Sequence, residues 1–179
     1  PGDLKGAGRI ILPGIGAFGP AMRSLAERNL VEAVRERVRD GLPLLGICLG
    51  MQMLFDASEE FGEHEGLGLV PGQVKTIPQA TPEGAPLRIP HIGWNRIRSV
   101  SPSGWREGLF ADLAEGQAFY FVHSLTAWPD DEGHRLADSA YGGHRISAAV
   151  QNGNVCGVQF HPEKSGPAGL SVLRRFVAF

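Results

Sequence analysis

A cysteine between two glycines is the residue of this sequence best placed for covalent chemistry. Residues 46–50 read Gly-Ile-Cys-Leu-Gly, and Cys48 stands where the predicted buried strand 44–48 gives way to a predicted helix start. Such a turn holds a nucleophile in a strained conformation, and the glycines remove side chains that would clash. The helix start would favour the thiolate, and the Leu49 amide could face a developing oxyanion. The alternative is a small buried apolar residue, but the flanking glycines favour a nucleophile.

A histidine followed by a carboxylate could serve that cysteine. His161 comes directly after the predicted strand 155–159, and Glu163 stands two residues later. A histidine can take a thiol proton and return it to a leaving amine, while a carboxylate fixes its tautomer and orientation. Catalytic partners are commonly distant in sequence. The alternative is a surface turn without a catalytic role, and the cysteine motif favours catalysis.

A glycine-rich segment offers a competing interpretation. Residues 14–19 match the G-x-G-x-x-G fingerprint of dinucleotide-binding proteins, after a strand and before a helix. That site needs an acidic residue at the end of the second strand, but this strand ends at Cys48, and Asp40 falls at a helix end. We therefore treat a dinucleotide-binding module as a minor alternative. We favour a backbone loop beside the cysteine, whose Ile15 amide supplies a second oxyanion donor.

The remaining histidines give no metal-binding pattern. His64, His134 and His144 fall in polar or glycine-rich loops, whereas His91 and His123 border strand-like segments. No two histidines have a metal-ligand spacing such as H-E-x-x-H. We expect neither a metal site nor a cofactor.

The elements that must position these residues alternate in type. The first third reads as strand 9–12, a helix over about 20–38, strand 44–48 and a helix from 49. That order predicts an α/β fold with a mainly parallel sheet. The segment 66–105 reads instead as an antiparallel, loop-rich insertion.

The last third returns to regular elements. A strand at 118–122 ends at His123-Ser124, and the runs 146–151 and 155–159 predict a hairpin. Apolar residues at helical spacing predict a final helix.

Composition excludes several function classes. The 179 residues carry 17 Lys and Arg against 19 Asp and Glu, a net charge of −2, so nucleic acid and anionic membranes are not expected partners. Two cysteines make no disulfide framework, which favours a reducing cytoplasm. We expect one domain over 1–179, without a signal peptide or membrane span.

Taken together, five motifs resemble the triad-type, or class I, glutamine amidotransferases. They are 13–19, 46–52, 90–95, 120–124 and 161–165, in the family's order. The segments 90–95 and 120–124 are most similar to those of glutaminase subunits that serve histidine biosynthesis. The resemblance implies a flavodoxin-like α/β sheet flanked by helices.

The resemblance also implies a reaction and a partner. Cys48, His161 and Glu163 would hydrolyse L-glutamine to glutamate and ammonia through a thioester, and ammonia would pass to a (βα)8-barrel cyclase in a heterodimer. The residues at family positions that hold glutamine are Gly14, Gly16, Gln52, His123 and Ser124. Those at positions near the partner and the ammonia passage are His91, Trp94, Asn95, Tyr120 and Lys164. For Trp94 and Tyr120, ordinary core packing is an equal alternative.

The sequence departs from the family at its start. Members usually open with one further strand and helix, about 30 residues by βαβ dimensions, so we expect an N-terminally truncated domain. Alternatives that remain open are another class I amidotransferase, serving anthranilate or pyridoxal phosphate synthesis, and a non-catalytic docking subunit.

Overall fold

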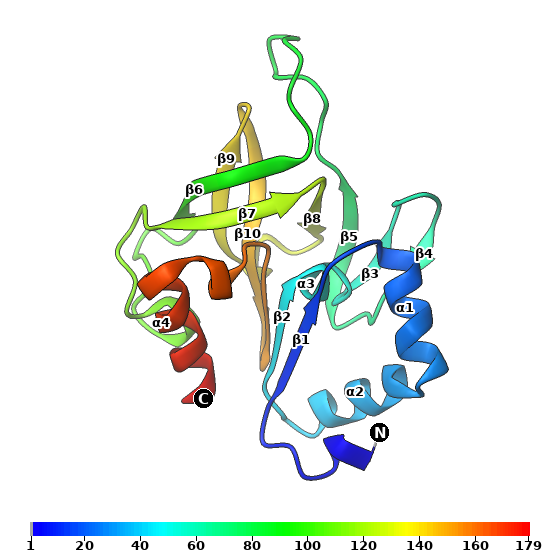
Figure 1. Ribbon diagram of the computed structural model, residues 1–179. Coiled ribbons are helices and arrows are strands. Elements are labelled where there is room, and N and C mark those ends of the chain that lie inside the picture. Colours follow the sequence, from blue (N-terminus) through cyan, green and yellow to red (C-terminus); the bar gives the residue numbers. More distant parts are fainter. Residues whose placement is uncertain (1) are drawn as a thin grey trace.

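A computed structural model describes residues 2–179 and shows two sheets with helices on both sides (Figure 1). The larger sheet has the strand order β1-β2-β11-β10-β9-β6-β7, and the smaller has the order β4-β3-β5-β8. The strands are β1 Ile10–Gly14, β2 Leu44–Cys48, β3 Phe55–Ser58, β4 His64–Glu65, β5 Val70–Thr76, β6 His91–Ser99, β7 Ala118–His123, β8 Leu125–Pro129, β9 Arg135–Tyr141, β10 His144–Asn152 and β11 Val155–Val158. The helices are α1 Phe18–Glu27, α2 Leu30–Arg39, α3 Leu49–Gln52 and α4 Gly166–Val177, with short 3-10 turns at Gly2–Leu4, Gly108–Phe110, Glu132–His134 and Pro162–Lys164.

The α/β class predicted from the sequence is confirmed, and the parallel part of the sheet is limited to three strands. Strand β2 pairs in parallel with β1 on one side and with β11 on the other. The pairs β11–β10, β10–β9, β9–β6 and β6–β7 are all antiparallel. The sheet is therefore mixed rather than mainly parallel, since its antiparallel part is built from β7, β9 and β10 together with β6 from the segment predicted as an insertion.

Two apolar cores lie on opposite faces of the larger sheet. One packs α1 and α2 against the sheet and includes Phe18, Val34 and Phe55. The other packs α4 against it and includes Phe160 and Phe176. Figure 1 shows α1 and α2 on one side of β1 and β2, and α4 on the other. This layering leaves the carboxyl ends of β1 and β2 free to carry a site.

The helical elements differ from the prediction in two places. The predicted helix over 20–38 is split into α1 and α2, because Asn29 adopts a left-handed conformation with φ 55°. The helix that follows Cys48 is a single turn. The hairpin predicted for 146–151 and 155–159 is confirmed by antiparallel pairing of β10 with β11.

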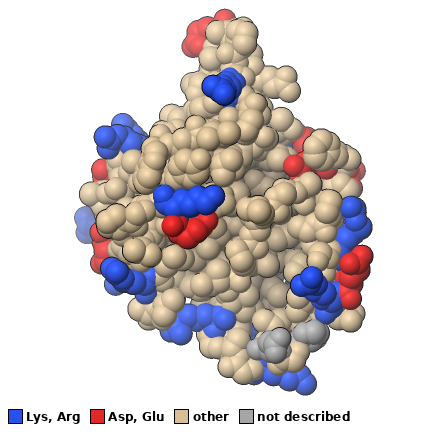
Figure 2. Space-filling view, in the orientation of Figure 1, with Lys and Arg blue, Asp and Glu red and all other residues tan. Residues whose placement is uncertain are grey.

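The surface has two further features. The connection from β5 to β6 projects from the body of the molecule, and charged side chains lie mostly at the periphery of the face in view (Figures 1 and 2). No helix within residues 2–179 is long and apolar enough to cross a membrane.

Candidate active site

Cys48 occupies the sharp turn that its flanking glycines predict. Its backbone has φ 54° and ψ −112°, a conformation that residues other than glycine rarely adopt. A Cβ on Gly46 would lie 2.6 Å from the Gly50 carbonyl oxygen, and a Cβ on Gly50 would lie 1.7 Å from that of Leu12. Both positions therefore require glycine, because the turn of α3 approaches the backbone of β2 at Gly46 and that of β1 at Gly50 too closely for any side chain.

The Cys48 thiol is buried among polar groups. Only 7% of the residue is exposed, its sulfur lies 3.8 Å from the Val122 carbonyl oxygen, and the Gln159 side-chain nitrogen approaches it to 3.7 Å. The pKa of the thiol is raised to about 11, chiefly by burial; the Leu49 backbone N–H lowers this pKa, and the negative charge of Glu163 contributes to raising it. The backbone at the helix start thus favours the thiolate, as expected from the sequence, but burial has the larger effect on the pKa. A four-residue helix offers too little to offset desolvation, so this thiol needs a base.

His161 is held beside the cysteine by the sheet and by its own backbone. Strand β11, which ends three residues earlier, pairs in parallel with β2, and Val158 lies opposite Ile47. The His161 N–H donates to the Tyr120 carbonyl at 2.9 Å, and its carbonyl accepts from the Ser165 hydroxyl at 2.6 Å. Its backbone is thereby fixed from both sides.

The imidazole of His161 has one nitrogen engaged and one free. Nδ1 lies 2.7 Å from a carboxylate oxygen of Glu163. Because an ionised carboxylate only accepts, Nδ1 carries the proton and Nε2 of the neutral ring has a free lone pair. Among the described residues, Nε2 is buried without a hydrogen-bond partner. An unpartnered buried nitrogen of this kind is what a general base for a neighbouring thiol requires.

A cavity of about 310 Å³ brings most of the predicted residues together. Cys48 and His161 both line it, at the carboxyl ends of the parallel strands. The other predicted residues in its wall are Ile15, Gly16, Leu49, Gln52, His123 and Ser124. Gly14 is not in the wall and instead packs against Leu49. Glu163 is not in the wall; it bonds His161 from behind, and its charge acts on Cys48 at a distance.

The glycine loop is occupied in a way that argues against a dinucleotide. The N–H of Phe18, at the start of α1, donates to a carboxylate oxygen of Glu60 at 2.6 Å. A pyrophosphate needs the positive end of this helix. Here a carboxylate already takes it, and its charge would repel a phosphate.

The comparisons with known proteins agree with this geometry. A family model described as glutamine amidotransferase class-I matches residues 3–178. The chain belongs to this family. Imidazole glycerol phosphate synthase subunit HisH 1 of Legionella pneumophila (strain Lens) is 44% identical over 99% of this chain and 84% of its own length. The HisH subunit of Geobacillus thermodenitrificans is 48% identical over 98% of this chain and 81% of its own length.

Solved structures support the fold of a class I glutamine amidotransferase. A crystal structure titled glutamine amidotransferase superposes with a TM-score of 0.69 at 22% identity, over 97% of this chain and 79% of the other. The glutaminase domain of Trypanosoma brucei CTPS with bound acivicin gives a TM-score of 0.59 at 18% identity, over 99% of this chain and 74% of the other. At these identities, the likeness concerns the fold alone.

Three residues of this amidotransferase site were missed by the sequence analysis. Gln159 is fully buried and links Cys48 to Gln52. The side-chain nitrogen of Gln52 donates to the side-chain oxygen of Gln159 at 3.0 Å. Ser165 accepts from the Tyr120 N–H at 3.0 Å besides holding His161. Glu60 lines the cavity. Only Gln159 carried a signal, as a polar residue that ends an apolar run.

The residues expected near a partner differ in how far they are exposed to solvent. Trp94 is 60% exposed, Lys164 is exposed, and Tyr120 packs edge-on against Trp94 with ring centroids 6.2 Å apart. His91 is 3% exposed, so direct contact with a partner is not available to it. Asn95 is half-buried on the same strand, β6.

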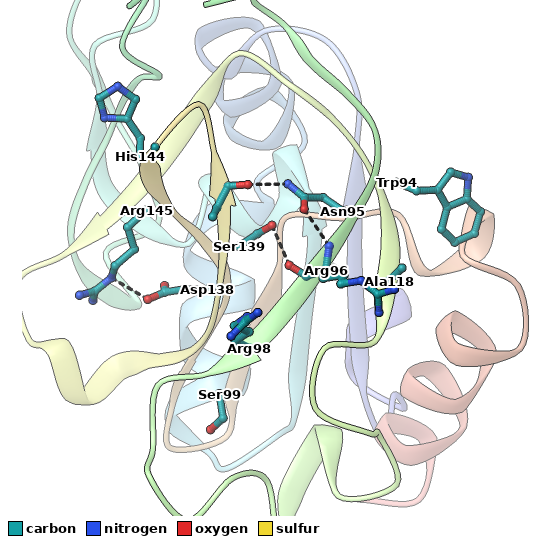
Figure 3. A pocket seen from close by; sticks show the side chains of 12 residues that line it. Trp94, Asn95, Arg96, Arg98, Ser99, Ala118, Asp138, Ser139, His144 and Arg145 are labelled. Carbon is teal, nitrogen blue, oxygen red and sulfur yellow. Dashed lines mark hydrogen bonds and ion pairs between the residues drawn. The ribbon is translucent and has the colours of Figure 1, made fainter. Parts of the chain in front are cut away.

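A larger cavity of about 800 Å³ lies over β6, β9 and β10 (Figure 3). Its charged residues include a mutual ion pair, Arg145 with Asp138 at 2.6 Å. Neither Cys48 nor His161 lines it. We therefore assign the Cys48 chemistry to the cavity of about 310 Å³, although the other cavity is larger.

Proposed function

We propose that this chain is the glutaminase subunit of an imidazole glycerol phosphate synthase and acts in the cytoplasm. The observation that carries the proposal is the cavity shared by a buried thiol and the free Nε2 of His161. The identity of 44–48% with several HisH subunits over nearly the whole chain supports this subunit over those that serve anthranilate or pyridoxal phosphate synthesis.

The first step is nucleophilic attack on the amide carbon of glutamine. Nε2 of His161 takes the thiol proton of Cys48 as the sulfur–carbon bond forms. The resulting imidazolium is stabilised by Glu163, whose carboxylate accepts the Nδ1–H at 2.7 Å. The amides of Leu49 and Ile15 are the candidate donors to the oxyanion.

The second step releases ammonia and then glutamate. His161 returns its proton to the amine, the carbon–nitrogen bond breaks, and a thioester on Cys48 remains. Water then attacks the thioester carbonyl with His161 again as base, the carbon–sulfur bond breaks, and the proton returns to the sulfur. The same two residues therefore serve both half-reactions.

The cavity wall contains suitable binding partners for both ends of a glutamine molecule. Glu60 supplies a negative charge for the α-ammonium group. Gln52 lies near the sulfur through Gln159 and can bond the side-chain amide. The backbone at Gly16, the ring of His123 and Ser124 complete the wall.

A cyclase subunit with a (βα)8 barrel is the proposed partner and receives the ammonia. Its candidate docking surface is marked by exposed apolar side chains, which are unusual unless they meet a partner. Ile15 is 85% exposed beside the cavity, and Ile92 and Trp94 are exposed on β6. Figure 2 shows few charges over the middle of the face that contains β1 and β7.

Glutamine hydrolysis assayed with and without the cyclase tests the proposal. Cys48→Ala should lower turnover at least about a thousandfold, because the covalent route is lost. Cys156→Ala is the matched control, since Cys156 is a buried thiol outside the cavity wall. Unchanged turnover in Cys48→Ala would refute the catalytic assignment. Stimulation by the glutamine-dependent partner of another pathway, and not by the cyclase, would refute the subunit assignment.

A further inference from the structure

Two histidines meet edge-on at the wall of the active site. His91 on β6 and His123 on β7 are cross-strand partners, and His91 Nδ1 lies 2.9 Å from His123 Nε2. His123 lines the catalytic cavity, whereas His91 lies behind it, stacked against Tyr141 with ring centroids 4.0 Å apart. Sheet register and stacking therefore hold both rings in place.

The proton positions in this pair follow from its two ends. At one end, His123 Nδ1 lies 2.6 Å from the Leu125 carbonyl oxygen. A carbonyl only accepts, so Nδ1 carries the proton and Nε2 of a neutral His123 is an acceptor. His91 must then donate from Nδ1, which leaves its own Nε2 as an acceptor.

The other end gives the same answer independently. The Asn95 side-chain oxygen accepts the Arg96 N–H at 2.8 Å, so its NH₂ group faces the Ala140 carbonyl at 2.8 Å (Figure 3). The same NH₂ group lies 3.4 Å from His91 Nε2. The amide therefore offers His91 a hydrogen. All four ring nitrogens are matched, and one extra proton on either ring would place N–H against N–H.

We propose that His91 and Asn95 are positioning residues for glutamine hydrolysis, which hold His123 neutral in the cavity wall through hydrogen bonds that run from Asn95 to His91 to His123 to Leu125. This rests on the glutaminase function proposed above. The segment held in this way includes Val122, whose carbonyl faces the Cys48 thiol, and Ser124 in the cavity wall.

A neutral His123 matters because His161 must become positively charged during each half-reaction. The titratable groups that share the cavity with His123 are Cys48, Glu60 and His161, and behind it lie His91 and Tyr141. A second imidazolium in this wall would disfavour the one that forms on His161. Burial lowers the pKa of His123 to about 3 and that of His91 to about 4, in agreement with the matched chain.

Nitrogen NMR of the full-length protein labelled with ¹⁵N-histidine tests the proton positions directly. We expect His91 and His123 to carry hydrogen on Nδ1 and to remain neutral from pH 5.5 to 8.5, with His91→Phe and His123→Phe used for assignment. Hydrogen on Nε2 of either ring, or titration with a pKa near 6.5, would overturn the proposal. This measurement does not depend on catalysis, so it fails separately from the glutaminase function.

A pair of variants then tests the role in catalysis. Asn95→Ala removes the hydrogen that Asn95 offers His91, whereas Asn95→Asp supplies an acceptor that reverses the chain and favours a second proton on His123. With the cyclase present, we expect the acidic limb of kcat/KM for Asn95→Asp to move up by about one pH unit, a tenfold loss below the limb. Asn95→Ala should keep the wild-type limb. Identical limbs in both variants, with the fold intact by thermal unfolding, would overturn the positioning role.

Discussion

The buried thiol leads to an unusual prediction for its reactivity in the absence of glutamine. The pKa of Cys48 is raised from 9.0 to about 11, chiefly by desolvation. At pH 8 the thiolate fraction is then about one in a thousand, against about one in ten for an unperturbed thiol. The resulting hundredfold difference corresponds to about 3 kcal/mol in favour of the neutral thiol. Alkylation of resting Cys48 should be slower by that factor.

The assay is the rate of carbamidomethylation of Cys48 by iodoacetamide, followed by mass spectrometry between pH 7 and 10.5. The measurement uses Cys156→Ala, which removes the second buried thiol. The rate should rise about tenfold per pH unit throughout this range, because the pKa lies above it. A control peptide with an exposed cysteine should level off near its ordinary pKa.

The variant Glu163→Gln separates the resting thiol from catalysis. The charge of Glu163 raises the pKa of Cys48, so the variant should alkylate faster at pH 8. The same variant should hydrolyse glutamine more slowly, because His161 loses its charged partner at 2.7 Å. A rate that levels off below pH 9, or slower alkylation in Glu163→Gln, would refute this account of the resting site.

Three further predictions concern the scaffold. Gly50→Ala should cost at least about 3 kcal/mol of unfolding free energy or prevent folding, since its Cβ would lie 1.7 Å from a carbonyl oxygen of β1. Gly6→Ala is the control, because a Cβ there meets open space. Equal urea midpoints for the two variants would contradict this prediction. Because burial lowers the pKa values of His91 and His123, the folded state binds fewer protons, so unfolding free energy should fall by about 3 kcal/mol from pH 7.5 to 5.5 in urea titrations and fall less in His91→Phe. Ser165→Ala should lower kcat about tenfold with little change in KM, because it loosens the backbone that carries the base, and an unchanged kcat would show that this hydroxyl is dispensable.

The residues that the sequence reveals best are those whose requirements are local. Two glycines around Cys48 mark a turn that tolerates no side chain, and the structure shows the close approach that excludes one. The hairpin of β10 and β11 likewise follows from two strand-like runs joined by the turn residues Asn152-Gly153-Asn154. Patterns within a few residues therefore predicted the place of the nucleophile and the strand before the base.

The contacts that escaped the sequence analysis join distant segments. Gln52 meets Gln159 across 107 positions, and His91 meets His123 only because β6 and β7 pair in one register. A one-residue slip would turn the two rings to opposite faces of the sheet. The raised pKa of the thiol could not be predicted either, since it depends on how deeply tertiary packing buries Cys48.

The parallel pairing of β2 with β11 has a consequence for how this enzyme can change. Each strand delivers one reacting residue, so the separation of sulfur and imidazole is set by a hydrogen-bonded ladder inside the molecule. Of the long stretch of chain between them, the end of β7 also touches the site, whereas the β5–β6 connection does not line the catalytic cavity except at Pro90. Lengthening, shortening or exchanging the projecting tip of the β5–β6 connection should therefore leave the spacing of the reacting atoms untouched.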